Sequence, residues 1–171
     1  SRRQRQMCIR DRRSVTQDEF RPMDIDNTPP MSMGTRSHEL SMFVIYDQWM
    51  AYLCDSPTEY NKYPDVLDFL SKVPAVWDKT LPLQAKLSEY IVTAKQKGND
   101  WYVGGMTNWD ARSTEVNLSF LKDNVSYQAT IFKDAPNSYK QPKEYMVEKR
   151  TVDSKTILNL SLIHISEPTR H

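Results

Sequence analysis

The chain has 171 residues, of which 39% are hydrophobic and 26% charged, and its mean hydropathy is −0.69. No run of residues approaches the roughly 20 apolar positions that a membrane-spanning helix needs, so a helical membrane span is excluded. Two cysteines are too few for a disulfide scaffold, and four glycines leave no glycine-rich loop to bind phosphates.

The two ends of the chain differ in composition from the middle. Residues 1–13 carry six Arg and one Asp, a charge of +5, whereas residues 14–160 carry 16 basic and 20 acidic side chains, a charge of −4. Clustered Arg neutralises phosphates, so nucleic-acid binding is one alternative for residues 1–13. However, residues 1–13 and 161–171 both resemble translated sequencing-adapter text, so we interpret them as not native and expect no nucleic-acid partner.

The remaining sequence contains few of the residues that most enzyme chemistry uses. Cys54 and His38 are its only cysteine and histidine, which is too few for a Cys/His zinc site. It also lacks the G-x-S-x-G, P-loop and G-x-G-x-x-G patterns of hydrolase elbows and nucleotide-binding loops.

Residues 31–74, which follow a polar segment, show the alternation of an α/β fold. Residues 14–30 are polar and end in two prolines, which predicts a loop. Thr35 is a predicted N-cap of a buried helix that runs to about Tyr46. The apolar residues 49–54 predict a buried strand, and residues 64–73 predict a helix that begins at a proline. Helix, strand and helix in this order are typical of α/β folds.

Beyond about residue 79 the hydrophobic period changes from that of helices to that of strands. Apolar and polar residues alternate over residues 90–95, 116–120 and 127–131, and residues 97–100 read as a hairpin turn. Further strands are predicted near 101–103, 145–152 and 157–160. About six short strands with turns between them predict an antiparallel sheet or small β-sandwich.

Residues 31–160 resemble the C-terminal part of glycoside hydrolase family 97. The matching text, in order, is MSMGTRSH (31–38), DSP (55–57), VPAVWDKT (73–80), EYIV (89–92), WYVGGMT (101–107), LSFL (118–121) and IFKD (131–134). The family pattern differs where this chain has Glu39, Ser41 and Ala51, which leaves open the preference between glucosides and galactosides.

The resemblance implies a bacterial, periplasmic or secreted enzyme that hydrolyses α-glucosides or α-galactosides in oligosaccharides and binds calcium. Residues 31–78 would be the last helix–strand–helix of a (β/α)8 TIM barrel. Residues 79–160 would be a C-terminal β-sandwich domain that makes homo-oligomers. The catalytic and calcium-binding carboxylates of the family lie upstream of the matching text, so we expect this fragment to be inactive and to bind no calcium itself.

Three residues are candidates for substrate binding. Asp55 follows a predicted barrel strand, where the active sites of such barrels lie, although it also suits the cap of the turn before Pro57. Arg36 and His38 lie at a predicted helix start, where they either hold a substrate group or tie a loop to a neighbouring unit.

A different class of function is also open for residues 79–160. Trp101, Tyr102 and Trp109 would form a platform for sugar rings if their side chains shared one surface. The alternative function is therefore a non-catalytic β-sandwich module for interaction or carbohydrate binding. Aromatic residues on short strands also serve as core or interface residues, where they bury large areas.

Overall fold

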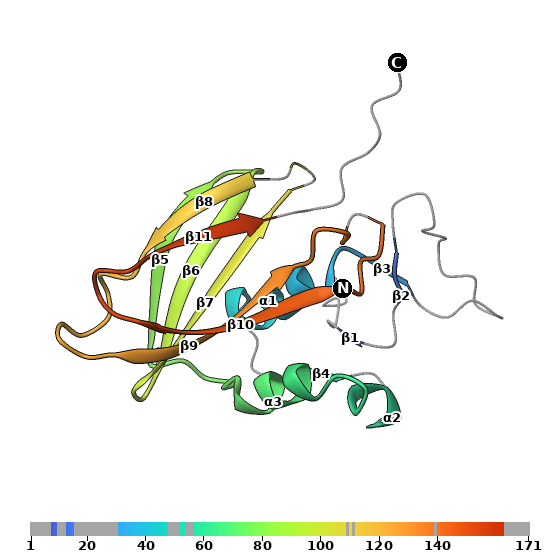
Figure 1. Cartoon of the computed structure of the whole chain (residues 1–171), viewed down its shortest axis with the longest axis horizontal. Helices are drawn as coiled ribbons and strands as arrows, with labels where there is room; N and C mark the ends of the chain where they lie inside the picture. Colours follow the sequence, from blue (N-terminus) through green and yellow to red (C-terminus); the bar gives the residue numbers. More distant parts are fainter. Residues whose placement is uncertain are drawn as a thin grey trace, which may run out of the picture.

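The computed structural model describes residues 8–9, 13–15, 31–47, 52–53, 57–108, 110, 112–138 and 140–162. Helices and short strands come first in the chain, and seven longer strands follow (Figure 1). The first group consists of β1 (Cys8–Ile9), β2 (Arg13–Val15), β3 (Met31–Met33), α1 (Arg36–Ile45), β4 (Tyr52–Leu53), α2 (Pro57–Tyr60) and α3 (Pro64–Lys72). The second consists of β5 (Lys79–Lys86), β6 (Tyr90–Lys97), β7 (Asp100–Thr107), β8 (Arg112–Asn117), β9 (Tyr127–Asp134), β10 (Tyr145–Val152) and β11 (Ile157–Leu162).

The two predicted helices are confirmed. Helix α1 begins directly after Thr35, whose hydroxyl accepts a hydrogen bond from the backbone N–H of His38 at 3.2 Å. Helix α3 begins at Pro64 and buries Val66. The short helix α2 was not predicted.

Part of the chain between the helices cannot be compared with its prediction. The strand predicted over residues 49–54 is described at Tyr52–Leu53, which pairs in parallel with Cys8–Ile9. Strand β2 pairs in parallel with β3. The rest of the predicted strand, the loop residues 16–30 and the end of the chain from residue 163 lie outside the described residues.

The antiparallel prediction for residues 79–160 is confirmed. Strands β5, β6 and β7 form one sheet in that order, β9 pairs with β10, and β8 pairs with β11. The β9–β10 hairpin is therefore inserted in the chain between two strands that pair with each other. Strand β5 was missed, and its ladder with β6 shifts register between Pro82 and Gln84, because a proline interrupts the pairing pattern.

The prediction that a strand runs through Leu118 and Phe120 is wrong. Strand β8 ends at Asn117, whose side-chain oxygen accepts a hydrogen bond from the N–H of Ser119 at 2.9 Å. Asn stabilises turns in this way. The chain turns, and both Leu118 and Phe120 still reach the core.

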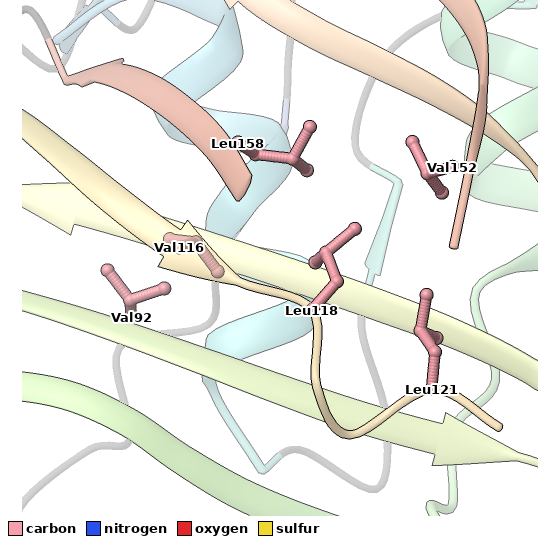
Figure 2. Packing of buried hydrophobic residues seen from close by; sticks show 6 residues of the cluster. All are labelled: Val92, Val116, Leu118, Leu121, Val152 and Leu158. Atoms are coloured by element: carbon pink, nitrogen blue, oxygen red, sulfur yellow. The ribbon is translucent and has the colours of Figure 1, made fainter. Parts of the chain in front are cut away.

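The core lies between the β5–β6–β7 sheet and the other strands. Its buried cluster gathers Val92, Val116, Leu118, Leu121, Val152 and Leu158 (Figure 2). At the outer edge, the side chain of Gln84 on β5 donates to the carbonyl of Glu115 on β8 at 2.7 Å and accepts from the Thr114 hydroxyl at 2.6 Å. These two bonds tie the edge of the sheet to β8.

Strand β6 is buried on both faces. Its four central residues, Val92 to Lys95, are all buried. Because successive side chains point to opposite faces of a sheet, Val92 faces the core and Thr93 faces away from it. Thr93 pairs with Gly104 of β7, and Gly104 is where helix α1 lies on the sheet.

The contact between α1 and β7 requires glycine. A Cβ atom at Gly104 would lie 2.8 Å from Cγ1 of Ile45, 3.1 Å from Cβ of Val44 and 3.2 Å from the carbonyl oxygen of Ser41. Ordinary contacts between carbon atoms are longer, about 3.5–4.0 Å. The helix therefore approaches the strand closely because no side chain separates them.

We expect Gly104→Ala to lower the free energy of unfolding by about 1–3 kcal/mol, because the added methyl overpacks the contact with α1. Urea denaturation measures the change. Ile45→Ala removes the nearest atom, so the double variant should lose less stability than the sum of the single variants.

The control is Gly98→Asn, at a hairpin position with φ of +58° and no atom near its added Cβ. Asn tolerates this conformation, so the change should stay within about 0.5 kcal/mol. A Gly104→Ala variant as stable as the parent chain would contradict the tight contact.

Candidate functional site

The candidate residue Arg36 takes part in packing at the start of α1. The guanidinium carbon of Arg36 lies 4.2 Å from the ring centre of Tyr63, and the backbone N–H of Arg36 donates to the carbonyl of Pro142 at 3.0 Å. A guanidinium over an aromatic face is a favourable cation–π contact. Arg36 thus joins α1 to the segment before α3 and to the loop before β10.

The other two candidates are placed less fully. His38 is half-buried in the first turn of α1 and lines a cavity described below. Asp55 lies outside the described residues. The substrate-binding role of Arg36, His38 and Asp55 therefore stays a prediction.

Six aromatic side chains join α3 to the strands. We call them the aromatic junction: Tyr63, Phe69, Trp77, Tyr102, Phe132 and Tyr145. The ring centres of Phe69 and Phe132 are 5.3 Å apart, and those of Trp77 and Tyr102 are 5.2 Å apart. The Tyr102 hydroxyl donates to the carbonyl of Lys72 at 2.9 Å. Such pairs stabilise a contact by about 0.5–1.5 kcal/mol beyond the area they bury.

The two tyrosines from the strands are held in their neutral form. Burial raises the pKa of the Tyr102 hydroxyl, and the nearby Asp100 carboxylate adds to the increase. Burial likewise raises the pKa of Tyr145, with a further contribution from Asp65. These hydroxyls act as hydrogen-bonding groups and not as bases near neutral pH.

A buried lysine lies beside the aromatic junction. The side chain of Lys95 is only 1% exposed, and its Nζ lies 2.5 Å from Oδ1 of Asp47. The same Nζ lies 5.5 Å from the ring centre of Trp77. Burying an ammonium group is costly unless it is paired, so Asp47 and Trp77 provide the partners that allow Lys95 to face α1.

Of the three aromatic residues considered for a sugar-binding platform, Trp101 and Tyr102 can be compared with the structure, and they have different neighbours. Trp101 packs on Phe120 in the core, with ring centres 4.8 Å apart. Tyr102, the next residue, belongs to the aromatic junction on the other face. Adjacent strand residues point to opposite faces, and Trp109 lies outside the described residues.

A cavity of about 870 Å³ lies where β7 and β9 diverge. Its walls include Trp101, Phe120 and Tyr127, and His38 of α1 also reaches it. In the described part of the chain, β7 pairs with β6 alone. The cavity lies between strands that belong to different sheets, because residues of both β7 and β9 line it.

Three carboxyl groups of the described residues have a lowered pKa because hydrogen bonds stabilise their ionised form. A hydrogen bond from Lys133 is the main cause that lowers the pKa of Glu148, and hydrogen bonds from the N–H of Gly98 and from Lys97 lower that of Asp78. Hydrogen bonds of Thr156 and Lys155 lower the pKa of Asp153. The general acid of a glycosidase has a raised pKa, which is the direction opposite to these three shifts.

The turn between β5 and β6 carries a network of charges. The Glu89 carboxylate forms salt bridges with Nζ of Lys86 at 2.5 Å and with Nη1 of Arg112 at 2.7 Å. Nη2 of Arg112 also lies 3.2 Å from Oδ2 of Asp110. The hydrogen bond from Lys86 is the largest cause that lowers the pKa of Glu89. We call residues 86–89 the tip.

No group of three or more His, Cys, Asp or Glu side chains that could hold a metal ion occurs among the described residues. Nor is any described helix long and apolar enough to cross a membrane.

Sequence reasoning missed the pairing of Lys95 and the tip network. Lys95 follows Val92, Thr93 and Ala94, and the alternation of the strand places it on the face opposite Val92. The alternation alone does not tell which face helices cover. The partners of Glu89 come from the start of β8, and no local pattern predicts that contact.

A family model and curated relatives match this chain. The family model described as "Glycosyl-hydrolase 97 C-terminal, oligomerisation" matches residues 76–165. A retaining alpha-galactosidase from Bacteroides thetaiotaomicron is 45% identical over 119 residues, which are 70% of this chain and 18% of the relative. A probable retaining alpha-galactosidase from Streptomyces bingchenggensis is 34% identical over 80 residues, 47% of this chain and 13% of the relative.

Solved structures agree with these matches. A glycoside hydrolase family 97 enzyme from Pseudoalteromonas sp. strain K8, in complex with acarbose, superposes with a TM-score of 0.74 at 30% identity. The match covers 78% of this chain and 22% of that one. A beta-arabinopyranosidase superposes with a TM-score of 0.66 at 16% identity, which shows a shared fold. This chain spans less than a fifth of the two galactosidases above.

We expect the ion pairs of Glu89 to contribute to stability only while its carboxylate is ionised. Because its folded-state pKa lies below the unfolded value of about 4.3, the contribution is full above that value and is lost as the pH falls through the folded pKa. Urea denaturation from pH 6 down to acid should show a shallower loss of stability for Glu89→Gln than for the parent chain.

The control is Glu115→Gln, the same chemical change at an exposed site on β8. It should follow the parent chain more closely than Glu89→Gln does. Equal pH profiles for Glu89→Gln and the parent chain would contradict a native-state role of these ion pairs.

Proposed function

This chain belongs to glycoside hydrolase family 97, and we propose that it is the C-terminal part of a longer retaining α-galactosidase. The observation that carries the proposal is the 45% identity to the Bacteroides thetaiotaomicron galactosidase over 119 residues. The weaker match to a second galactosidase supports the same substrate class. In this proposal, α-linked galactosides are the substrates of the whole enzyme.

The first part of the chain, residues 31–78, is in our proposal the last helix–strand–helix of the catalytic (β/α)8 barrel. Support comes from the order α1, β4, α2 and α3. Helix α1 packs on β7, and Phe69 of α3 contacts Tyr102 and Phe132 of the strands. In such barrels the helices form the outer ring. A β-domain packed on the outside of the barrel would then meet helices first, as β7 meets α1.

The second part, residues 79–160, is the C-terminal domain and serves packing and assembly. Its aromatic side chains pack against α3 and in the core, and its shifted carboxyl groups are engaged in ion pairs and hydrogen bonds. The family description names oligomerisation, and we propose that the domain joins copies of the enzyme.

The chemical step is assigned to the upstream part of the longer enzyme. Retaining hydrolysis uses two carboxyl groups about 5–5.5 Å apart, one as nucleophile and one as acid and then base. The family's calcium ion also belongs to that upstream part in our proposal. A periplasmic or secreted location fits an enzyme that meets oligosaccharides outside the cytoplasm.

We expect the 171-residue chain alone to release no p-nitrophenol from p-nitrophenyl α-galactoside. A longer gene product that extends upstream through the full barrel should hydrolyse it. Proton NMR of the first product should then show the α-anomer, because two inversions retain the configuration. Faster release from p-nitrophenyl α-glucoside, or a β-anomer as first product, would overturn the galactosidase assignment.

A fluorescence titration tests the alternative that residues 79–160 are a carbohydrate-binding module. Titration of the chain with galacto-oligosaccharides should leave Trp fluorescence unchanged, because Trp101 is packed on Phe120 in the core. Saturable quenching that disappears in Trp101→Phe would favour a carbohydrate-binding module. The same titration of Trp77→Phe controls for the tryptophan in the aromatic junction.

A further inference from the structure

Exposure along one face of strand β6 runs against the polarity of its side chains. Ile91, Thr93 and Lys95 alternate along the strand, so all three point to the face on which the helices lie. Lys95 is 1% exposed and Thr93 is 5% exposed, whereas Ile91 is 37% exposed. The charged residue is buried and the aliphatic residue is open, which is the reverse of the usual preference.

Ile91 has an apolar neighbour on each side across the sheet. Ala85 of β5 pairs with Ile91, and Ile91 pairs with Met106 of β7. Residues that pair directly place their side chains on the same face. Ala85 is exposed and Met106 is half-buried. We call Ala85, Ile91 and Met106 the open stripe.

The covered part of this face meets the helices in a definite order along β7. Tyr102, Gly104 and Met106 alternate on that strand and therefore share the face. Helix α3 reaches Tyr102, because the ring centre of Phe69 lies 6.5 Å from that of Tyr102 and the carbonyl of Lys72 accepts its hydroxyl. Helix α1 lies on Gly104. The order along the strand is thus α3, then α1, then the open position of Met106.

The order of the helices in the chain identifies what comes next. In the barrel proposed above, α1 and α3 belong to the outer ring, in which helices follow one another around the barrel. Helix α3 lies on one side of α1, so the helix that precedes α1 in the chain lies on the other side. That helix comes before β3. The chain spans 22% of the family 97 structure described above, so a longer polypeptide of that size has ample length for it.

The size and place of the open stripe favour a segment of the same polypeptide over a second copy. A stable interface between separate proteins buries about 800 Å² on each partner, from roughly 20–30 residues. The open stripe has three residues. A helix of the same polypeptide needs no such area, because α1 already holds it near the sheet and little translational freedom is lost. The open stripe also continues the contact of α1 on Gly104.

We propose that the open stripe is the surface on which the helix preceding α1 in the longer enzyme packs, through an apolar face. The inference rests on the barrel assignment proposed above and deepens it, because it names the residues of the β-domain that the upstream part contacts. Along β7, successive positions of one face would then meet three successive helices of the ring.

Thiol labelling of Ile91→Cys tests the proposal in the 171-residue chain and in a longer gene product that extends upstream through the barrel. We expect N-ethylmaleimide to react with the introduced thiol at least about tenfold more slowly in the longer product, because the thiol must first be exposed by local opening. The protection should not change on dilution. Mass spectrometry of the peptide that contains position 91 keeps Cys8 and Cys54 from interfering.

Ile157→Cys is the matched control, because Ile157 is 53% exposed and lies on β11, away from the helices. It should react equally fast in both proteins. Met106→Cys provides a second position on the open stripe, where the same protection is expected. Circular dichroism and urea denaturation check that each variant folds.

The outcomes separate this inference from the proposed function. A longer product that hydrolyses α-galactosides, but in which Ile91→Cys reacts as fast as in the 171-residue chain, overturns the inference and leaves the function standing. Protection that disappears on dilution, or that appears in the 171-residue chain at high concentration, assigns the open stripe to a second copy and also overturns the inference. Protection in a longer product without galactosidase activity supports the inference and contradicts the proposed substrate.

Discussion

The close contact between helix α1 and strand β7 determines how the two parts of this chain are joined. A helix normally keeps a side-chain layer between its backbone and a sheet, but here Val44, Ile45 and Ser41 come within reach of the position where Gly104 would carry a Cβ. The consequence is that residues 31–47 cannot be separated from the β-domain without opening this contact. The first helix is part of the support of the sheet, although the family match begins only at residue 76.

This contact also determines which side chains lie on each face of the β5–β6–β7 sheet. The face toward β8 and β11 holds the hydrophobic core, which includes Val92 and Trp101. The face toward the helices holds Gly104, Tyr102 and Lys95, which need the helix, the aromatic junction and Asp47 as partners. Strand β6 is consequently buried on both faces, as strands covered by helices on one side and a second sheet on the other must be.

The chemistry of the described side chains follows from these packing roles. Arg36 lies on Tyr63, and the ionised Glu148 and Glu89 are paired with basic side chains. Groups engaged in this way hold a structure together and are poorly placed to transfer protons to a glycosidic oxygen. These packing roles fit the C-terminal part of a family 97 hydrolase.

The sequence by itself determined the features that depend on neighbours in the chain. Thr35 and Pro64 marked the starts of two helices, and Gly98 marked a hairpin. An ordered set of short motifs, of which Trp101 to Thr107 is one, carried the family resemblance. Caps, turns and periodicity are local, so they can be read without the fold. The position of Leu118 shows the limit, because the alternation continued while Asn117 had already turned the chain.

Only the tertiary structure decided which faces are covered. Trp101 and Tyr102 are adjacent, yet one enters the core and the other meets Trp77. Lys95 is a charged residue of an alternating strand, and the structure buries it against Asp47. Leu87 is apolar, and the structure leaves it exposed. Burial depends on elements distant in the sequence, such as α1 on β7, and hydrophobic period alone does not say what packs on each face.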